Sequence, residues 1–457
     1  MIGLALEHPV DSTSVASAPG PRGLPVLGSF FEARRDPLGF LAREAERHGP
    51  LVSFRLGPYR FLLVASPDGV RHVCVENFRN YVKGPGWDGL RHFLGQGLLT
   101  SDGDLWQRQR RLAQPAFHRE RLGRLVDQMV GATTERLLAW HDAAGVDVLA
   151  EMMRLTLSIV SRTMFGIDVA EQSRAIGPAL GVALKYASDA ADTPVPIPLW
   201  VPTPGNVQFK RAVRTLDDTV LAIIHGRKDG ADRGDLLSLL MAARDEETGE
   251  GMSEKQLRDE VMTIVMAGHE TTANALSWAF FLLARHPDVA ARVAAEADEV
   301  IGDGVPSLEN LPRLRYASMV FQETLRLYPP VWLTDRRAIA DDRISGFDVP
   351  AGSIVALSPW VMHHLPRLWP DPERFDPERF APERVAERDR YVYLPFGVGP
   401  RQCIGNHFAM MEAAIILAMV ARRFRLSLAP GQTVDPEPYA TLRPRHGLPM
   451  KLARRVG

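Results

Sequence analysis

The sequence predicts a mainly α-helical protein with small β-sheets, of the α+β class. Apolar residues recur with a helical period over most of the chain, and only two stretches have the composition and turn residues of paired strands. The longest helical segment runs from Ser253 to Pro287. Helices are expected near residues 36–48, 67–77, 102–114, 118–142, 146–165, 171–190, 206–227, 234–244, 253–287, 287–302, 315–328 and 404–423.

The two strand regions are short. LVSFRL and RFLLVA flank Gly57 and Pro58 and predict a hairpin. GFDVPAGSIVALS predicts a second strand pair, turning at Ala351 and Gly352. The β-structure is therefore expected to form a small lobe beside a large helical body.

The composition excludes some functions. The 457 residues carry a net charge of −1, which argues against nucleic-acid binding. The N-terminus, MIGLALEHPVDSTSV, has neither a long apolar run nor a basic flank, so neither a signal peptide nor a membrane anchor is expected. Together with the rich use of Ala, Arg and Pro, this predicts a soluble, cytoplasmic, bacterial-type protein.

Cys403 lies in a glycine-rich loop, FGVGPRQCIG, directly before a predicted helix. The only other cysteine, Cys74, is distant in the sequence, and neither has the spacing of a zinc site. An inert core thiol is one interpretation, since free cysteines are often buried. A sulfur near a helix N-terminus is otherwise expected to favour the thiolate, a nucleophile or metal ligand. Arg401 adds a positive charge suited to a carboxylate on the bound group.

This loop resembles the haem-binding signature of the cytochrome P450 family, FxxGxRxCxG, with matches at Phe396, Gly399, Arg401, Cys403 and Gly405. The resemblance implies the P450 fold, a single helical domain over residues 21–457 with a β-rich lobe, after a disordered or extended N-terminal segment, residues 1–20. It implies haem b between the long central helix and the cysteine-loop helix, with Cys403 as axial ligand. Loop residues expected at the haem are Phe396, Gly397, Arg401 and Gly405.

The segment Ser253 to Pro287 predicts one very long helix with a polar centre. It opens with a capping box at Ser253 and Gln256 and stops at a proline. The polar centre rules out a transmembrane span, and a solvated stripe is the plain alternative. Otherwise these residues are expected to break the helix ladder locally and make room for dioxygen and water. The centre consists of Gly268, His269, Glu270, Thr271 and Thr272.

AGHETT, from Ala267 to Thr272, is similar to the family's oxygen-activation motif. By that resemblance Glu270, Thr271 and Thr272 are catalytic: the acid and the first hydroxyl deliver protons through a relay. Ala267 and Gly268 are expected to contact haem. His269 as a second axial ligand is conceivable, but its position in the motif is variable and favours a structural role.

Two further motifs imply fixed positions around the haem. ETLR, with Glu323 and Arg326, and the second of two PERF copies, with Arg379, resemble the family's Glu/Arg/Arg cluster, which is structural. A surface ion pair is the alternative for ETLR alone. WQRQRR places Trp106 and Arg110 on one helix face, similar to the family's WxxxR pair that binds a haem propionate. Further propionate candidates by position are Arg336 or, in its place, Arg337.

The family's distal pocket suggests the substrate residues. Almost all are apolar, which favours a hydrophobic substrate such as a terpene, fatty acid, steroid or macrolide, although each residue could equally be ordinary core. Residues 192–205, with five prolines, cannot form a regular helix and are interpreted as a lid connection or a rigid spacer. The predicted pocket residues are Leu99, Met266, Ala267, Val331, Trp332 and Leu333.

The resemblance implies a haem-thiolate monooxygenase that inserts one oxygen atom of O2 into an apolar substrate by hydroxylation or epoxidation. Because no flavin or iron–sulfur domain is recognised, electrons are expected from separate proteins, a ferredoxin and a ferredoxin reductase, docking on a basic proximal face of a monomer. Two alternatives stay open. The same fold serves peroxygenase, desaturation or oxidative coupling chemistry, and a non-catalytic haem sensor would have no need of AGHETT.

Overall fold

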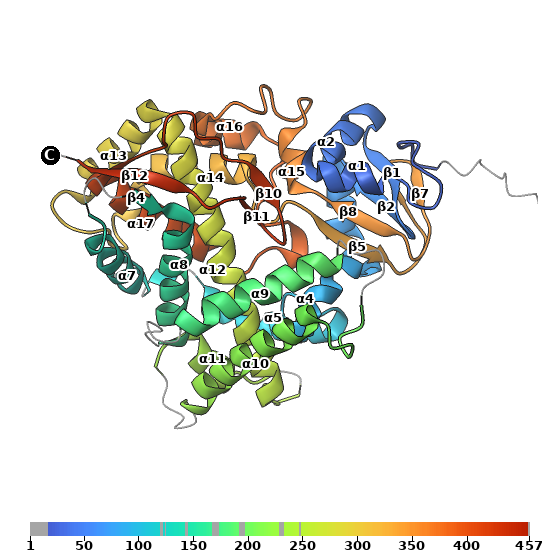
Figure 1. Ribbon diagram of the computed structural model, residues 1–457, viewed down its shortest axis with the longest axis horizontal. Coiled ribbons are helices and arrows are strands. Elements are labelled where there is room, and N and C mark those ends of the chain that lie inside the picture. Colours follow the sequence, from blue (N-terminus) through green and yellow to red (C-terminus); the bar gives the residue numbers. More distant parts are fainter. Residues whose placement is uncertain are drawn as a thin grey trace, which may run out of the picture.

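The computed structural model describes residues 17–455 except 119–121, 124, 142–144, 167–172, 192–196, 228–232 and 246–247. A β-rich lobe lies to one side of a larger helical body (Figure 1), and the predicted fold class is confirmed. The α-helices are α1 (Phe30–Arg35), α2 (Pro37–His48), α3 (Pro67–Arg71), α4 (Asp88–Leu94), α5 (Gly103–Ala113), α7 (Val126–Leu138), α8 (Val148–Phe165), α9 (Ser173–Ala191), α10 (Pro204–His225), α11 (Leu236–Ala242), α12 (Glu254–Arg285), α13 (Pro287–Ile301), α14 (Arg315–Leu327), α15 (Pro359–His364), α16 (Pro382–Glu387) and α17 (Asn406–Arg423).

The described strands form small separate sheets. The largest has the order β1-β2-β8-β5-β3, and the others are β4-β12-β9, β6-β7 and β10-β11. The strands are β1 (Leu51–Leu56), β2 (Tyr59–Val64), β3 (Tyr81–Lys83), β4 (Gly145–Asp147), β5 (Thr334–Ala338), β6 (Asp342–Ile344), β7 (Phe347–Val349), β8 (Ile354–Leu357), β9 (Phe424–Ser427), β10 (Pro436–Pro438), β11 (Leu442–Pro444) and β12 (Pro449–Arg454).

One strand prediction holds and the other does not. β1 and β2 form the expected antiparallel hairpin, with Leu56 opposite Tyr59. The predicted pairing about Ala351 and Gly352 is wrong, because β7 pairs with β6, while β8 lies between β2 and β5 in the large sheet. Every residue of β8, sequence IVAL, is buried. Such an apolar strand is most stable at the centre of a sheet, covered on both faces.

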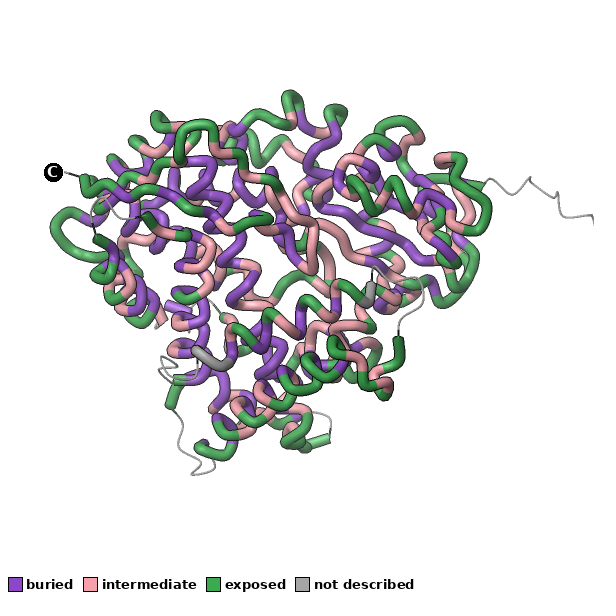
Figure 2. The backbone as a smooth tube through the Cα atoms, in the orientation of Figure 1, coloured by how far each residue is buried: buried purple, intermediate pink, exposed green. Residues whose placement is uncertain are grey.

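Helix α12 runs through the middle of the helical body (Figure 1). The Ser253 hydroxyl caps it by accepting the Gln256 N–H at 3.2 Å, as the capping box predicts. The helix packs most extensively against α8. Buried residues concentrate along these inner helices, and exposed ones lie at the periphery (Figure 2). The long helix is thus the frame to which the surrounding segments attach.

The polar centre does not interrupt α12, so the predicted local break in the helix ladder is wrong. The Thr271 hydroxyl donates to the carbonyl of Ala267 at 2.7 Å, and the Thr272 hydroxyl donates to that of Gly268 at 3.2 Å. Both hydroxyls therefore find acceptors one turn back on their own helix. The helix stays regular because these polar groups are satisfied without opening it.

The segment predicted as one helix over residues 118–142 contains the shorter helix α7, and part of it lies outside the described residues. Beyond α7, the indole N–H of Trp140 donates to the buried carboxylate of Glu151 on α8 at 2.7 Å. Of the predicted lid connection, residues 192–196 lie outside the described part, and Trp200 is 79% exposed. No helix in the described ranges is long and apolar enough to cross a bilayer.

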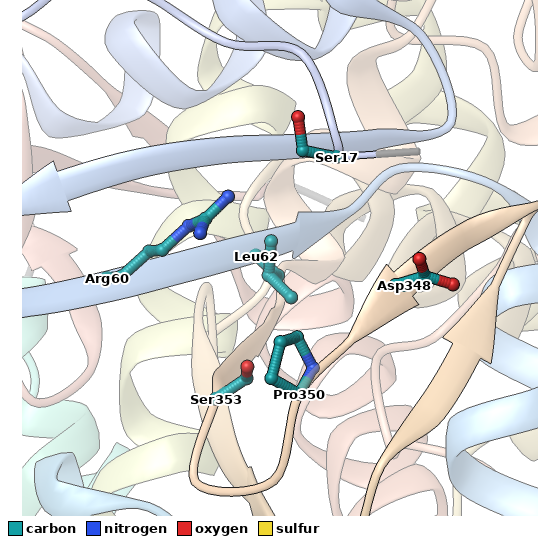
Figure 3. A pocket seen from close by; sticks show the side chains of 6 residues that line it. All are labelled: Ser17, Arg60, Leu62, Asp348, Pro350 and Ser353. Atoms are coloured by element: carbon teal, nitrogen blue, oxygen red, sulfur yellow. The ribbon is translucent and has the colours of Figure 1, made fainter. Parts of the chain in front are cut away.

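The β-rich lobe contains a small hollow of about 80 Å³ (Figure 3). Its walls combine Leu62 of β2 with Asp348 of β7 and Pro350, and its rim includes Arg60 and Ser353. Ligand sites for drug-sized molecules measure roughly 300–1,000 Å³. This hollow is therefore too small for the expected substrate.

Candidate active site

The loop before α17 presents Cys403 at the edge of a surface depression. The Cys403 N–H donates to the carbonyl of Phe396 at 2.8 Å, which closes the loop. Gly397 and Gly399 have φ angles of 65° and 74°, which glycine adopts without strain. A Cβ on Gly399 would also meet the carbonyl oxygen of Cys74 at 2.2 Å. Glycine at these positions is what allows the chain to bring the sulfur here.

Cys403 is exposed, and the neighbours of its sulfur have opposing effects on the charge of that sulfur. Desolvation by the surrounding protein raises the pKa of the Cys403 thiol, while the Gly405 N–H and the charge of Arg110 act in the opposite direction. The effects of the Gly405 N–H and of Arg110 act in the direction that the sequence predicts for a sulfur near a helix N-terminus. A metal ion would supply the missing positive charge, because a thiol that coordinates a metal loses its proton.

Arg401 ties the cysteine loop to the start of α5. Its guanidinium donates to the Ser101 carbonyl at 2.8 Å and to Asp102 Oδ1 at 2.7 Å, and it lies 4.0 Å from the centre of the Trp106 ring. One turn further along α5, Arg110 donates to the carbonyl of Gln402 at 2.9 Å. The fold thus gathers the predicted cationic and aromatic residues of both segments around the cysteine loop.

Two cations, the buried Lys83 and the half-buried Arg336, lie on neighbouring strands. Lys83 of β3 is in register with Arg336 of β5, and the Lys83 ammonium is 3.6 Å from the centre of the Trp87 ring. Burial lowers the pKa of both cations, and neither forms an ion pair within the described residues. Arg337, the alternative to Arg336, is exposed. Such cations, without a paired carboxylate, fit the propionates of a haem.

In the middle of α12, one face is less deeply buried than the others. From Asp259 to Leu283 every residue is buried except Ile264, Ala267, Gly268 and Thr271, which are half-buried. Their spacing of i, i+3, i+4 and i+7 places them on one helix face. A flat cofactor packed against the helix would cover such a stripe. The predicted haem contacts, Ala267 and Gly268, and the predicted catalytic hydroxyl of Thr271 all belong to it.

Glu270 is buried where α12 meets the hairpin of β10 and β11. Thr441 donates to Glu270 Oε1 at 2.7 Å, whereas Oε2 has no hydrogen-bond partner within the described part of the chain. Burial raises the pKa of this carboxyl, against the lowering effects of Thr441 and Arg443. A carboxyl with a raised pKa can hold a proton nearer neutral pH and pass it on, which suits a general acid.

His269, the neighbour of Glu270, faces the helical core. The Thr156 hydroxyl of α8 donates to the His269 carbonyl at 2.9 Å, and the side chain is buried. Burial lowers the pKa of His269 to about 4, so the imidazole is neutral at pH 7. These contacts fit the structural role that the sequence favours.

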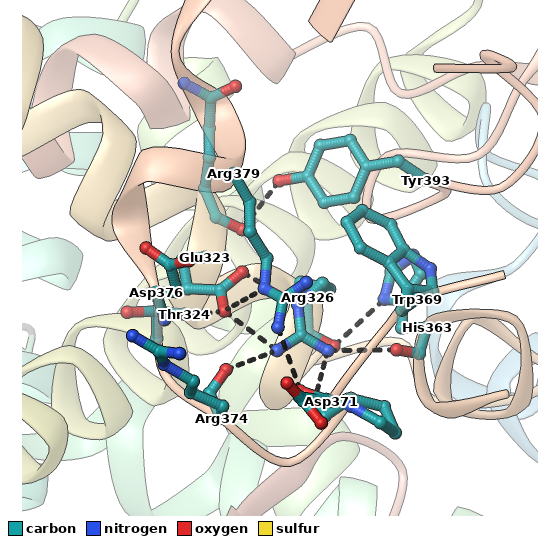
Figure 4. A network of polar contacts seen from close by, with 12 residues as sticks. Glu323, Thr324, Arg326, His363, Trp369, Asp371, Arg374, Asp376, Arg379 and Tyr393 are labelled. Atoms are coloured by element: carbon teal, nitrogen blue, oxygen red, sulfur yellow. Dashed lines mark hydrogen bonds and ion pairs between the residues drawn. The ribbon is translucent and has the colours of Figure 1, made fainter. Parts of the chain in front are cut away.

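Glu323 and Arg326 form a buried pair on α14 (Figure 4). Arg326 donates to both carboxylate oxygens, at 2.7 and 2.8 Å, and Arg379 adds an ion pair to Glu323 at 3.4 Å. The downstream PERF copy therefore contributes a side chain, whereas the upstream copy contributes two backbone carbonyls. The other Arg326 N–H groups donate to the carbonyls of His363, Pro372 and Arg374.

The residues predicted for the substrate pocket do not all share one environment. Leu99 and Met266 pack with the main helical core. Trp332 and Leu333 pack against the core of the β-rich lobe, and Val331 is exposed. The structure therefore brings Leu99 and Met266 to the α12 side, while the segment 331–333 lies between the two parts of the molecule.

Two buried acids escaped the sequence interpretation. Glu412 on α17 is fully buried, and neither carboxyl oxygen makes a well-formed hydrogen bond in the described chain, although Thr272 lies nearby. Glu260 on α12 accepts the N–H of Leu98 at 3.0 Å and so fixes the loop that carries Leu99. Glu412 interrupts an apolar run, AMMEAAII, and that interruption is the signal that could have revealed it, whereas Glu260 directly follows an arginine and an aspartate and has no such signal.

A sulfur ligand on one side and a proton-donating helix on the other define the class of haem-thiolate oxygenases. The comparisons agree with this class. The family model "Cytochrome P450" matches residues 18–451. Cyclooctatin synthase of Streptomyces melanosporofaciens is 41% identical, covering 92% of each chain, and the cyclooctat-9-en-7-ol 5-monooxygenase of the same organism is 40% identical, covering 92% of this chain and 91% of that one.

Among solved structures, the retinoic-acid-bound cyanobacterial CYP120A1 superposes with a TM-score of 0.87 at 28% identity, covering 97% of this chain and all of that one. The chain belongs to the cytochrome P450 family. It is a monooxygenase whose cofactor is haem b with an axial cysteine, and it uses O2 and electrons from redox partners to oxidise a hydrophobic small molecule.

Proposed function

We propose that Cys403 is the axial cysteine and that its loop and α5 hold the haem. The observation that carries this proposal is the convergence of Cys403, Arg401 and Trp106 from two distant segments. Within the described residues neither Lys83 nor Arg336 forms an ion pair, which supports their binding to a propionate. The remaining residues assigned to the haem are Arg110, Phe396, Gly397, Gly405, Ala267 and Gly268.

The carbon monoxide complex of the reduced protein tests the ligand. We expect the strongly red-shifted Soret band of thiolate ligation in the wild type and in the control Cys74→Ala, and its loss in Cys403→Ala. A red-shifted band that persists in Cys403→Ala would refute the assignment. Loss of that band in Cys74→Ala alone would identify Cys74 as the axial ligand instead.

Bound haem supplies the activation of dioxygen, and α12 supplies the protons. Glu270 holds a proton in a buried site, and the Thr271 hydroxyl, whose hydrogen is committed to the Ala267 carbonyl, offers its oxygen to orient a water molecule. Thr272, bonded to the next carbonyl, supports the same turn. We expect Thr271→Ala to consume electrons with little product and to release peroxide, and Thr271→Ser to restore coupling. Unchanged coupling in Thr271→Ala would remove Thr271 from the relay.

For the substrate we infer a cyclic terpene-type alcohol or hydrocarbon. The support is the relative whose name gives cyclooctat-9-en-7-ol as its substrate, together with the apolar character of Leu99 and Met266. Cyclooctat-9-en-7-ol, a long-chain fatty acid and a steroid can be compared by the low-spin to high-spin change of the haem spectrum. A response to the fatty acid or steroid but not to the cyclic alcohol would contradict the inference.

We further propose a cytoplasmic monomer, folded as one domain over residues 21–457, that receives electrons from a ferredoxin and ferredoxin reductase. The depression beside Cys403 supports the docking of an acidic ferredoxin, because Arg110, His118 and His407 line it. Reconstitution with a ferredoxin and its reductase should support turnover, and turnover should weaken as salt rises. Product formation with hydrogen peroxide alone, and none with the ferredoxin system, would favour the peroxygenase alternative.

A further inference from the structure

The tip of the hairpin formed by β10 and β11 is held rigidly against α12. The indole N–H of Trp278 donates to the carbonyl of Leu442 at 3.1 Å, and the Leu442 N–H donates to that of Pro330 at 2.8 Å. On the other side, the indole N–H of Trp332 donates to the carbonyl of Tyr439 at 2.8 Å. Three contacts to two different segments therefore fix the position of the residue between them, Thr441.

Thr441 belongs to a directed chain of hydrogen bonds that ends on Glu270. The Asn274 side-chain N–H donates to Thr441 Oγ1 at 2.9 Å, and the Thr441 hydroxyl donates to Glu270 Oε1 at 2.7 Å. All three side chains are at least 95% buried, so water does not compete for these bonds. Because Asn274 can only donate through this group, the Thr441 hydrogen is left to point at the carboxyl.

The two oxygens of Glu270 consequently differ. Oε1 is an acceptor for Thr441, whereas Oε2 is buried without a hydrogen-bond partner in the described residues. A proton on Oε1 would compete with the bond from Thr441, whereas a proton on Oε2 competes with no bond. We propose that Thr441 and Asn274 are positioning residues for Glu270, which reserve Oε1 as an acceptor and leave Oε2 to carry and release the proton. This inference rests on the proposed role of Glu270 as the acid.

The bond from Thr441 also balances the effect of burial. Burial favours the neutral carboxyl, and the donated hydrogen bond favours the carboxylate. Arg443 and Tyr439 from the same hairpin also face Glu270, and the positive charge of Arg443 acts in the same direction as Thr441. Thr441 therefore opposes the rise in the pKa of Glu270 that burial causes.

Infrared titration of the substrate-free, haem-loaded protein measures this directly. The C=O stretch of protonated Glu270 is identified as the band that Glu270→Gln abolishes, and its intensity is followed across the neutral pH range. We expect Thr441→Val, which removes the hydroxyl and keeps the shape, to raise the midpoint by about one to two pH units, since a hydrogen bond to a charged group is lost. Thr441→Ser should retain the wild-type midpoint.

Ser277→Ala is the matched control, because its buried hydroxyl bonds only to the Ala273 carbonyl of the same helix. It should leave the midpoint unchanged. Asn274→Leu removes the first donor of the chain and should raise the midpoint less than Thr441→Val does, so it provides a second test if that variant folds poorly. An unchanged midpoint in both variants, or a rise in Thr441→Ser equal to that in Thr441→Val, would overturn the proposal.

A coupling measurement separates this inference from the role of Glu270 itself. With cyclooctat-9-en-7-ol as the probe substrate, product formed per electron pair is compared between variants. If Glu270→Gln uncouples the reaction and Thr441→Val does so partly, with Thr441→Ser restoring coupling, both assignments are supported. Uncoupling in Glu270→Gln with wild-type coupling in Thr441→Val refutes the positioning role alone. Unchanged coupling in Glu270→Gln refutes the acid and, with it, its positioning residues.

Discussion

Replacing Glu260 by glutamine removes a buried carboxyl while keeping its size and its acceptor oxygen. Glu260 is fully buried on α12, and its Oε2 accepts the Leu98 N–H at 3.0 Å. Burial, reinforced by the negative charge of Asp259, raises the pKa of Glu260 from 4.5 to about 7. The titration of Glu260 should therefore contribute to the pH dependence of the free energy of unfolding.

The direction of the pH dependence follows from whether the native or the unfolded state binds the proton of Glu260. Between pH 4.5 and about 7 native Glu260 keeps a proton that the unfolded chain has lost, so wild-type stability falls as pH rises through this window. A pKa difference of one corresponds to about 1.4 kcal/mol, so the total loss is about 3 kcal/mol. Glutamine has no proton to lose, and the variant should gain about 3 kcal/mol relative to the wild type across this range.

Urea unfolding followed by circular dichroism, at several pH values between about 4.5 and 8, measures this difference. Because all other groups titrate in both proteins, subtracting the two curves isolates Glu260. Glu383→Gln, which removes an exposed carboxylate, controls for the loss of one charge. A difference between wild type and Glu260→Gln that stays constant with pH would refute the assigned burial and charge state of Glu260.

Arg326→Met should cost about 3–5 kcal/mol in urea unfolding, because it removes the cation of a fully buried ion pair, and a loss below about 1 kcal/mol would contradict the geometry. Glu412→Gln should stay within about 1 kcal/mol of the wild type, because burial raises the pKa of Glu412 well above its usual range and so favours the neutral carboxyl, which glutamine resembles; a large loss would mean that the carboxyl is charged. Lys83→Met should speed the transfer of haem to apomyoglobin, whereas Arg337→Met, at an exposed position, should not; equal rates would remove Lys83 from the haem site.

Local signals in the sequence are enough to predict the elements that carry the chemistry. The cap at Ser253 and the apolar period define α12, because both act between residues close together in the chain. The glycines before Cys403 predict a tight loop for the same reason. The pairing of β8 could not be predicted this way. The sequence of a short apolar strand does not specify which distant strand will pair with it.

The residues of the candidate site also differ in whether local sequence signals could predict their positions. Trp106 and Arg110 lie one turn apart, so their shared face follows from the helix period. Lys83 has no such signal: it becomes a buried cation only when β3 pairs with β5 and places it beside Arg336. The contact of Arg401 with Trp106 likewise has no local signal, because the two residues come from segments far apart in the sequence.

The sequence by itself determined the class of fold, the long helix with its acid and hydroxyl, the cysteine loop and the Glu323–Arg326 pair, because each is a pattern of neighbours along the chain. Only the tertiary structure decided that Thr441 bonds to Glu270, that Arg401 reaches Trp106, and that β8 lies inside the large sheet. Those contacts join residues far apart in sequence, and their free energy comes from burial and hydrogen bonding that arise only when the chain has folded.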